Sequence, residues 1–229
     1  YDCVYCQLGR TTTKTTERKE WVPLDDVLAE VRERLSSGPP CDFVGLAGSG
    51  EPTLHSRIGE AIRAIQAMTE VPVAVLTNGS LLFREDVRRD LMEADVVMPS
   101  LDAGDERLFG WVNRPADEVG FAEMVEGLVT FTREFPGEVW LEILLLQGVT
   151  EAPSQVARLV DLVKRIAPAR VQLNTVARPP AELFAKAVSE ARLHAIASLF
   201  PGRVEVIVDR DEPEPATGRD GDPDGILVL

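Results

Sequence analysis

The chain has 229 residues, of which 45% are hydrophobic and 27% charged, so it can bury a substantial core and is neither a disordered chain nor a disulfide scaffold. No apolar run approaches the ~20 residues that span a bilayer, which excludes an integral membrane protein. The 24 Lys and Arg residues against 38 Asp and Glu residues give a net charge of -14, which disfavours nucleic acid as a partner.

Three cysteines, an odd and sparse count, indicate a reducing, cytoplasmic setting. The chain opens on Tyr1 without an initiator Met, and we expect it to be cut from a longer protein. The acidic, Pro- and Gly-rich stretch Asp209 to Gly225 leads into the apolar stub Ile226 to Leu229. We therefore expect a core domain over residues 1–208, and a linker with the start of a truncated element over residues 209–229.

Helical and strand patterns alternate along the chain. Apolar residues recur with helical spacing over Leu24 to Leu35, Phe121 to Phe131 and Leu183 to Leu199. Short apolar runs predict strands at Phe43 to Ala47, Val73 to Thr77, Val96 to Ser100, Val139 to Leu146, Val171 to Asn174 and Val204 to Val208. This alternation predicts an α/β fold with parallel strands, arranged either as an open doubly wound sheet or as a barrel.

Polar and Gly-rich residues follow several of these strands. They are Gly48 to Thr53, Thr77 to Ser80, Pro99 to Asp102 and Asn174 to Thr175. Because parallel α/β folds place their active sites at the carboxyl ends of the strands, we expect the functional site at that end.

The pair Cys3 and Cys6 forms a Cys-x-x-Cys motif, whose two sulfurs can reach one soft metal. Taken alone, the motif fits a zinc ribbon, a redox dithiol or an iron-sulfur cluster. No second Cys-x-x-Cys and no His-x-x-x-His completes a zinc site, and the polar stretch Gly9 to Glu20 is a poor helix for a redox dithiol.

With the motifs taken in order, the chain resembles the radical S-adenosylmethionine (SAM) superfamily, whose signature is Cys-x-x-x-Cys-x-x-Cys. Cys3 and Cys6 match its second and third cysteines, and Tyr5 is the aromatic residue often found before the last one. Gly48-Ser49-Gly50-Glu51-Pro52 is similar to the family's Gly-Gly-Glu-Pro motif, and Thr77 to Gly79 and Ser100 to Asp102 are similar to its next strand motifs. The run Gln172 to Pro180 resembles the iron-sulfur oxidoreductase branch related to tRNA wyosine-base synthases.

The resemblance implies a partial (β/α)6 TIM-like barrel whose first strand is missing here, leaving a free edge on the Phe43 strand or on whichever strand neighbours the missing one. It implies a [4Fe-4S] cluster on Cys3, Cys6 and a cysteine two positions before Tyr1. The open iron of such a cluster binds SAM, and reductive cleavage yields a 5'-deoxyadenosyl radical for hydrogen abstraction. It also implies a reducing electron donor such as flavodoxin or ferredoxin.

The same resemblance suggests the residues that contact SAM. Glu51 is expected to accept a hydrogen bond from the SAM ammonium, with Gly48 and Gly50 allowing close backbone approach and unusual torsions. The remaining candidates are Tyr5, Asn78, Ser100, Asp102, Asn174 and Arg178. Ordinary turn chemistry is the competing interpretation of Asn78, Ser100 and Asp102.

Other polar residues have plainer expected roles. Glu142 lies in an apolar strand and should face the barrel interior with a partner, because an unpaired buried carboxylate is costly. A surface salt bridge is expected for Arg114, a surface or capping role for His55, and a small core position for Cys41.

The alternative function is a non-catalytic barrel that binds partners and holds a structural zinc or a degenerate cluster site. Within the enzyme hypothesis, the acidic composition favours a small-molecule, peptide or protein substrate, and disfavours tRNA. No membrane partner is expected.

Overall fold

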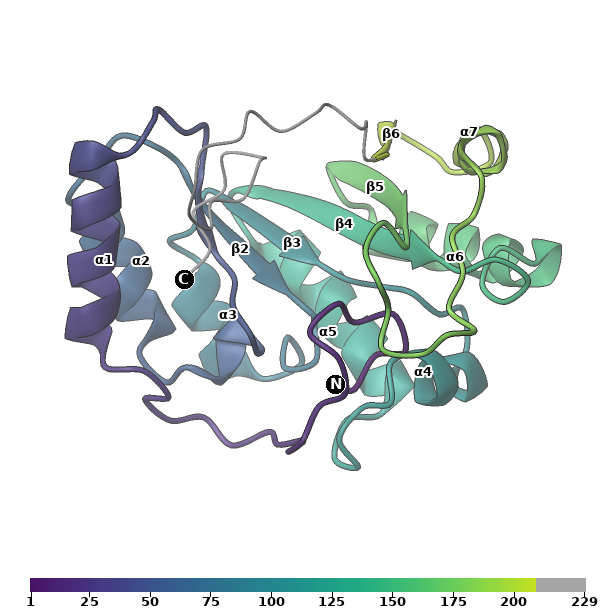
Figure 1. The fold of residues 1–229 in the computed structure, drawn as a ribbon, viewed down its shortest axis with the longest axis horizontal. Coiled ribbons are helices and arrows are strands. Elements are labelled where there is room, and N and C mark those ends of the chain that lie inside the picture. The colour runs from purple at the N-terminus through teal and green to yellow at the C-terminus, as the bar shows by residue number, and fades with distance from the viewer. Residues whose placement is uncertain (209–229) are drawn as a thin grey trace.

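The computed structural model describes residues 1–208 of the 229, which include a sheet of six parallel strands in the order β1-β2-β3-β4-β5-β6 (Figure 1). The strands are β1 (Val44–Leu46), β2 (Val73–Thr77), β3 (Val96–Pro99), β4 (Glu138–Leu145), β5 (Arg170–Thr175) and β6 (Val204–Val206). All six predicted strands are confirmed, with ends that differ by at most two residues. Residues 209–229, expected to form a linker and a truncated element, lie outside the described part.

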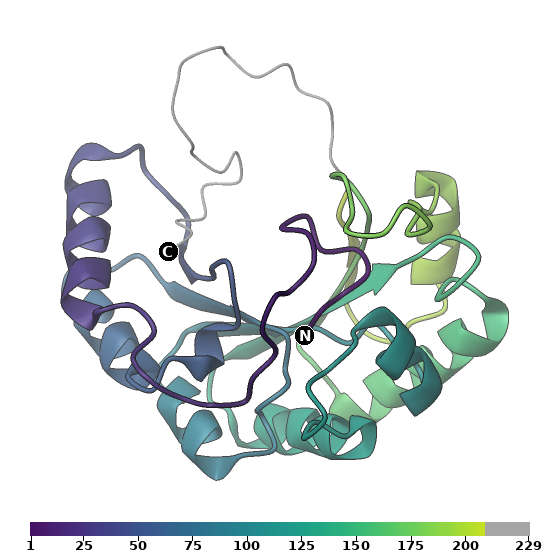
Figure 2. The same cartoon turned by 60° about the horizontal axis from the view of Figure 1, so that its bottom comes forward.

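Helices connect the successive strands and line the outer curve of the sheet (Figure 2). They are α1 (Leu24–Ser37), α2 (Ile58–Gln66), α3 (Glu85–Leu91), α4 (Glu106–Val112), α5 (Phe121–Glu134), α6 (Pro153–Ile166) and α7 (Glu190–Ala197), with the 3-10 turn η1 (Pro52–Leu54). The sheet curves into an arc, so the fold is a partial TIM-like barrel rather than an open doubly wound sheet. Within residues 1–208, β1 pairs with β2 alone, which confirms the free edge expected on this strand.

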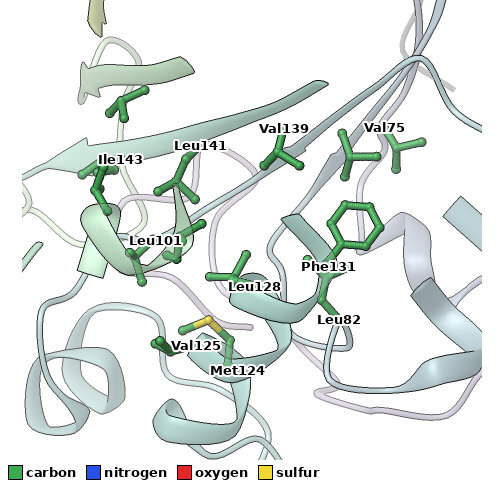
Figure 3. Packing of buried hydrophobic residues seen from close by; sticks show 14 of the residues in the cluster. Val75, Leu82, Leu101, Met124, Val125, Leu128, Phe131, Val139, Leu141 and Ile143 are labelled. Carbon is green, nitrogen blue, oxygen red and sulfur yellow. The ribbon is translucent and has the colours of Figure 1, made fainter. Parts of the chain in front are cut away.

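The hydrophobic core lies between the convex face of the sheet and the helices. Strand β4 alternates regularly, with Val139, Leu141 and Ile143 buried and the residues between them only half-buried. Figure 3 shows these three side chains directed toward Leu128 and Phe131 of α5. The alternate residues of β4 therefore face the concave side, where the loops that carry the polar motifs also gather.

The helix predicted over Leu183 to Leu199 is shorter than expected, since only Glu190–Ala197 is helical. The preceding residues bond to other parts of the chain: the Glu182 N–H donates to Val4, and the Gln147 N–H donates to Lys186. These long-range hydrogen bonds outweigh the helical pattern of the sequence.

The segment between the cysteines and α1 is held by one buried guanidinium. Arg18 donates to the carbonyls of Thr53 and His55 and forms ion pairs with Asp86 at 2.9 Å and Asp90 at 2.6 Å. Hydrogen bonds from Arg84 and then Arg18 lower the pKa of Asp86 to about 2, against the opposing effect of burial. Arg18 thus fastens the chain entering α1 to both η1 and α3.

Gly127 provides a test of the contact between α5 and the loop after β2. A Cβ at Gly127 would lie 2.4 Å from the Phe83 nitrogen, whereas a Cβ at Gly110 in α4 would meet nothing within 4 Å. Gly127→Ala is therefore expected to lower the free energy of unfolding by about 1–3 kcal/mol. The matched Gly110→Ala should raise it by ~0.5–1 kcal/mol. Urea unfolding measures both, and shifts of the same sign would contradict the packing described.

Arg18→Met tests the ion pairs with α3, with Arg89→Met as a control because Arg89 is exposed and has no ion pair among residues 1–208. We expect Arg18→Met to lower the free energy of unfolding by about 2 kcal/mol near neutral pH. The control should lower it by less than ~0.5 kcal/mol. The folded-state pKa of Asp86 lies below its unfolded value of about 4. The ion pair therefore stabilises the fold fully above about pH 4, and this stabilisation is lost as the pH falls toward 2. Urea unfolding should show that the difference in free energy of unfolding between Arg18→Met and wild type shrinks as the pH falls. A difference that stays constant with pH would count against the ion pair.

Candidate functional site

The cysteine-bearing segment crosses the centre of the arc, drawn in purple in Figure 2. Two backbone hydrogen bonds of Val4 hold it, one donated to Val112 at the end of α4 and one accepted from Glu182, both 2.9 Å long. The Val4 side chain is fully buried against Val112, Leu146 and Ala185. The loop thus joins the sheet through α4 and the segment after β5.

Cys3 and Cys6 are half-buried and unpaired, on a turn closed by the Cys6 N–H donating to the Cys3 carbonyl. Burial, and then the charge of Asp102, raise the pKa of Cys3 to about 12, so this sulfur stays protonated until a metal displaces the proton. Two free thiols on one turn fit two ligands of an iron-sulfur cluster. Within residues 1–208, no group of three His, Cys, Asp or Glu side chains is placed to hold a metal. The cysteine before Tyr1 stays a prediction.

Glu51 ties the loop after β1 to the end of β2. Its Oε1 accepts from the Thr53 N–H, the Thr53 hydroxyl and the Thr77 hydroxyl, at 3.0, 2.6 and 2.5 Å. Within the described residues, its Oε2 accepts only the Asn78 N–H, at 2.7 Å. The carboxylate therefore orders this loop, and its Oε2 can accept one more hydrogen bond from a further donor. The contact of Glu51 with the SAM ammonium stays a prediction.

The glycines of the same loop have ordinary torsions. Neither Gly48 nor Gly50 has a positive φ, so the unusual torsions expected there are not found; in this region only Gly79, at +73°, has one. A Cβ at Gly50 would meet nothing within 4 Å, so the chain leaves room there that a ligand can use. The Asn78 side chain accepts the Ser80 N–H at 2.8 Å, which is the turn role expected as its alternative.

Asp102 is buried and satisfied entirely by neutral donors. Its Oδ2 accepts from the Tyr5 hydroxyl and from Asn113 Nδ2, and its Oδ1 accepts the Leu144 N–H at 3.0 Å. Burial raises the pKa of Asp102 and that of Tyr5. The structure thus places Tyr5 and Asp102 against each other under the cysteine loop, and their contacts with SAM stay predictions.

The sequence pattern did not single out Asn113, which bridges Asp102 and Cys3. Its Nδ2 lies 2.8 Å from Asp102 Oδ2 and 3.5 Å from Cys3 Sγ. Its position at the end of α4, just before Arg114 and Pro115, was the only signal in the sequence.

A second carboxylate faces the concave side in β4. Glu142 accepts hydrogen bonds from Asn174 Nδ2 and from the Ser100 hydroxyl, which confirms the expected interior position with a partner. Burial, and then the charge of Asp102, raise the pKa of Glu142. Asn174 Oδ1 is buried without a hydrogen-bond partner in the part of the chain that the structure describes. Three strands thus bring Ser100, Glu142 and Asn174 together.

The Tyr1 side chain packs edge to face against Phe109, with ring centroids 5.4 Å apart. Its hydroxyl is buried without a hydrogen-bond partner among residues 1–208. Burial, and then the charges of Glu51, Cys3 and Asp102, raise the pKa of this phenol well above its ordinary value.

The remaining candidates lie farther out. Arg178 is exposed and donates to Gln7 at 3.3 Å, beside the cysteine loop. Arg114 pairs with Glu182 at 2.7 Å, as expected for a salt bridge. His55 bonds the Val22 carbonyl and the Arg57 N–H, which confirms a capping role, and Cys41 is only half-buried rather than a core residue.

A cavity of 530 Å³ adjoins the site on the side of α1. Trp21, Val22, Leu46 and Ile58 line it, together with Gly48 to Pro52. It thus includes the loop of Glu51 but neither cysteine. No helix within residues 1–208 is long and apolar enough to cross a membrane.

Several curated proteins are similar in sequence to most of this chain. It is 33% identical over 188 residues to the UPF0026 protein MJ1312 of Methanocaldococcus jannaschii, covering 81% of this chain and 58% of that protein. It is 32% identical over 205 residues to a UPF0026 protein of Helicobacter pylori J99, covering 88% and 65%. It is 36% identical over 209 residues to a protein of Brachyspira hyodysenteriae named GTPase Obg, covering 91% of this chain and 31% of that protein. The chain thus spans less than two thirds of these relatives, and none has a name from the wyosine branch.

Solved structures share the fold at low sequence identity. Streptococcus suis SuiB bound to S-adenosylmethionine superposes with a TM-score of 0.66 at 15% identity, covering 90% of this chain and 47% of that one. A domain of a pyruvate-formate lyase-activating enzyme from Bacteroides vulgatus gives a TM-score of 0.56 at 17% identity, covering 72% and 98%.

The family profile described as the Radical SAM superfamily matches residues 1–162, from the cysteine turn into α6. That span contains Cys3, Cys6, the loop of Glu51 and the Ser100 to Asp102 motif. The chain belongs to the radical SAM superfamily.

Proposed function

We propose that this chain is the core of an enzyme that holds a [4Fe-4S] cluster and SAM at the carboxyl ends of β1 to β5. The observation that carries the proposal is that Tyr5 and Asn113 join the cysteine turn to Asp102 after β3, while Glu51 is bonded at the ends of β1 and β2. When bound, the cluster and SAM supply reductive cleavage of a carbon–sulfur bond and hydrogen-atom abstraction from the substrate.

In this proposal, the chain binds and orients while the cofactors react. Cys3 and Cys6 hold the cluster with the predicted upstream cysteine, on a turn fixed by Val4. Glu51 keeps the loop of Gly48 and Gly50 in place and accepts the SAM ammonium at Oε2. The other polar candidates line the rest of the pocket: Tyr5, Asn78, Ser100, Asp102, Asn174 and Arg178.

The buried carboxylates support a cationic occupant. Asp102 and Glu142 are bonded only by neutral groups among residues 1–208, and their mutual proximity contributes to the raised pKa of Glu142. A sulfonium bound beside them would reduce this electrostatic cost.

For the substrate, we propose only a chemical class. The chain's charge of -14 supports a small molecule, peptide or protein over tRNA. Only the run Gln172 to Pro180 supports the wyosine-synthase branch. The name of the Brachyspira relative suggests a GTPase, but the match covers 31% of that protein, and no Gly-Lys pair of a phosphate-binding P-loop occurs in this sequence. We therefore do not propose GTP hydrolysis for this chain.

Anaerobic reconstitution of the full-length protein tests the proposal. We expect about four iron and four sulfide per chain, together with 5'-deoxyadenosine and methionine formed from SAM under dithionite. Cys3→Ala and Cys6→Ala should each abolish product formation and lower the bound iron, because each removes a ligand. Cys41→Ala is the matched control and should retain both, since Cys41 lies outside the turn. Stable zinc binding without iron would favour the non-catalytic alternative instead.

Glu51→Gln tests the carboxylate between β1 and β2. The Glu51 carboxylate accepts four hydrogen bonds, and an amide in its place has an NH2 group that cannot accept. We therefore expect the free energy of unfolding to fall by about 1–3 kcal/mol. SAM affinity, measured by equilibrium dialysis, should fall at least tenfold.

Thr77→Val is the companion variant, because it removes one donor to Glu51 and leaves the carboxylate charge. If Glu51 accepts the SAM ammonium, Glu51→Gln should weaken binding well beyond Thr77→Val at similar stability. Equal losses of SAM affinity in the two variants would show that Glu51 supports its loop and does not bind the SAM ammonium.

A further inference from the structure

The two cysteines of the turn differ in the hydrogen bonds that reach their sulfurs. Asn113 Nδ2 lies 3.5 Å from Cys3 Sγ, whereas no donor within residues 1–208 bonds Cys6 Sγ. The Tyr5 hydroxyl is also near Cys3, but its single proton is donated to Asp102 Oδ2. Asn113 is therefore the side chain that donates to the Cys3 sulfur.

The orientation of the Asn113 amide is set by a carboxylate. Its Nδ2 lies 2.8 Å from Asp102 Oδ2, which is an acceptor, so the nitrogen and not the oxygen of the amide faces Asp102. One N–H is thus directed at Asp102, and the second remains for Cys3. Asn113 is only 3% exposed, and its Oδ1 is buried without a partner among residues 1–208. The two contacts of Nδ2 therefore decide how the amide is placed.

The backbone holds Asn113 next to the cysteine turn. Asn113 ends α4, and its carbonyl accepts the Asp2 N–H at 3.0 Å. The Val4 N–H donates to Val112 at 2.9 Å. Hydrogen bonds to the end of α4 thus flank Cys3 on both sides, so the amide meets the sulfur from a fixed position.

A hydrogen bond to a ligand sulfur changes how readily an iron-sulfur cluster is reduced. The donor withdraws negative charge from the thiolate, and this stabilises the reduced cluster more than the oxidised one because the reduced cluster is the more negative. A neutral donor on one thiolate therefore raises the reduction potential. At Cys3 it also opposes the charge of Asp102, which disfavours negative charge on this sulfur.

We propose that Asn113 is a positioning residue that acts through Cys3 and raises the reduction potential of the cluster. This inference rests on the proposed function, in which Cys3 is a cluster ligand. One electron passes from an external one-electron reductant to the cluster, and no bond forms or breaks in this step. Asn113 neither gains nor loses a proton, and its N–H stabilises the negative charge on Cys3.

Asn113→Leu tests the inference, because Leu branches at the same atom as Asn and has no donor. The reconstituted full-length protein is titrated with dithionite in the presence of redox mediators and in the absence of SAM, and the reduced cluster is followed by EPR. We expect the ratio of reduced to oxidised cluster at a fixed potential to fall at least tenfold, which is a shift of about 59 mV for one electron. The bound iron should stay near the wild-type value, because the cysteines are unchanged.

Gln155→Met is the matched control. Gln155 is also a buried amide, and it donates to a carboxylate, that of Asp105, at 2.9 Å. Its hydrogen bonds among residues 1–208 reach neither cysteine. The ratio of reduced to oxidised cluster should therefore stay within twofold of wild type in this variant.

A second measurement uses the wild-type chain and does not depend on the folding of a variant. The full-length protein is labelled with nitrogen-15 in the side-chain amides of asparagine, and the reduced cluster is studied by pulsed EPR. We expect a hyperfine coupling to nitrogen-15, because Asn113 Nδ2 is one hydrogen bond away from a cluster ligand. Asn113→Leu should lose this coupling.

Two outcomes would overturn the inference alone. A ratio within twofold of wild type in Asn113→Leu would show that Asn113 only supports the turn. A wild-type cluster without the nitrogen-15 coupling would show that the amide does not donate to Cys3 when the cluster is bound. A wild-type protein that holds no reducible cluster would instead refute the proposed function, and this inference with it.

Discussion

The site depends on the backbone of Val4, which is bonded on one side by the end of α4 and on the other by the segment after β5. These two hydrogen bonds fix the turn that carries Cys3 and Cys6, while the buried Val4 side chain excludes water from the contact. The polar segment from Gln7 to Glu20 is held by contacts of its own, which include the ion pairs of Arg10 with Asp2 and Glu182 and those of Arg18 with α3. The cysteine turn is therefore part of the barrel mouth although it belongs to no strand.

Carboxylates organise the concave side of this barrel. Glu51 joins the loops after β1 and β2, Asp102 joins the cysteine segment to β4 through Tyr5 and the Leu144 N–H, and Glu142 joins β4 to β5 through Asn174. Every donor to these three groups among residues 1–208 is neutral, so their negative charge is distributed over hydrogen bonds rather than cancelled by cations. Such fixed polar groups preorganise a pocket before any ligand enters.

The concave interior presents carboxylates whose donors among residues 1–208 are neutral, which suits the cationic cofactor proposed above. The chain spans less than two thirds of the UPF0026 relatives that it matches.

The sequence by itself determined the six strands and the main motifs, because β-branched runs and Gly-rich strand ends are local signals. It also predicted the interior place of Glu142 from one carboxylate in an apolar strand. The resemblance to the radical SAM superfamily also implied the partial barrel, which the structure confirms. Only the tertiary structure decided that residues 183–189 leave the predicted helix and that Asn113 links Cys3 to Asp102. Cys3 and Asn113 lie 110 positions apart in the chain, and no local pattern encodes such a contact.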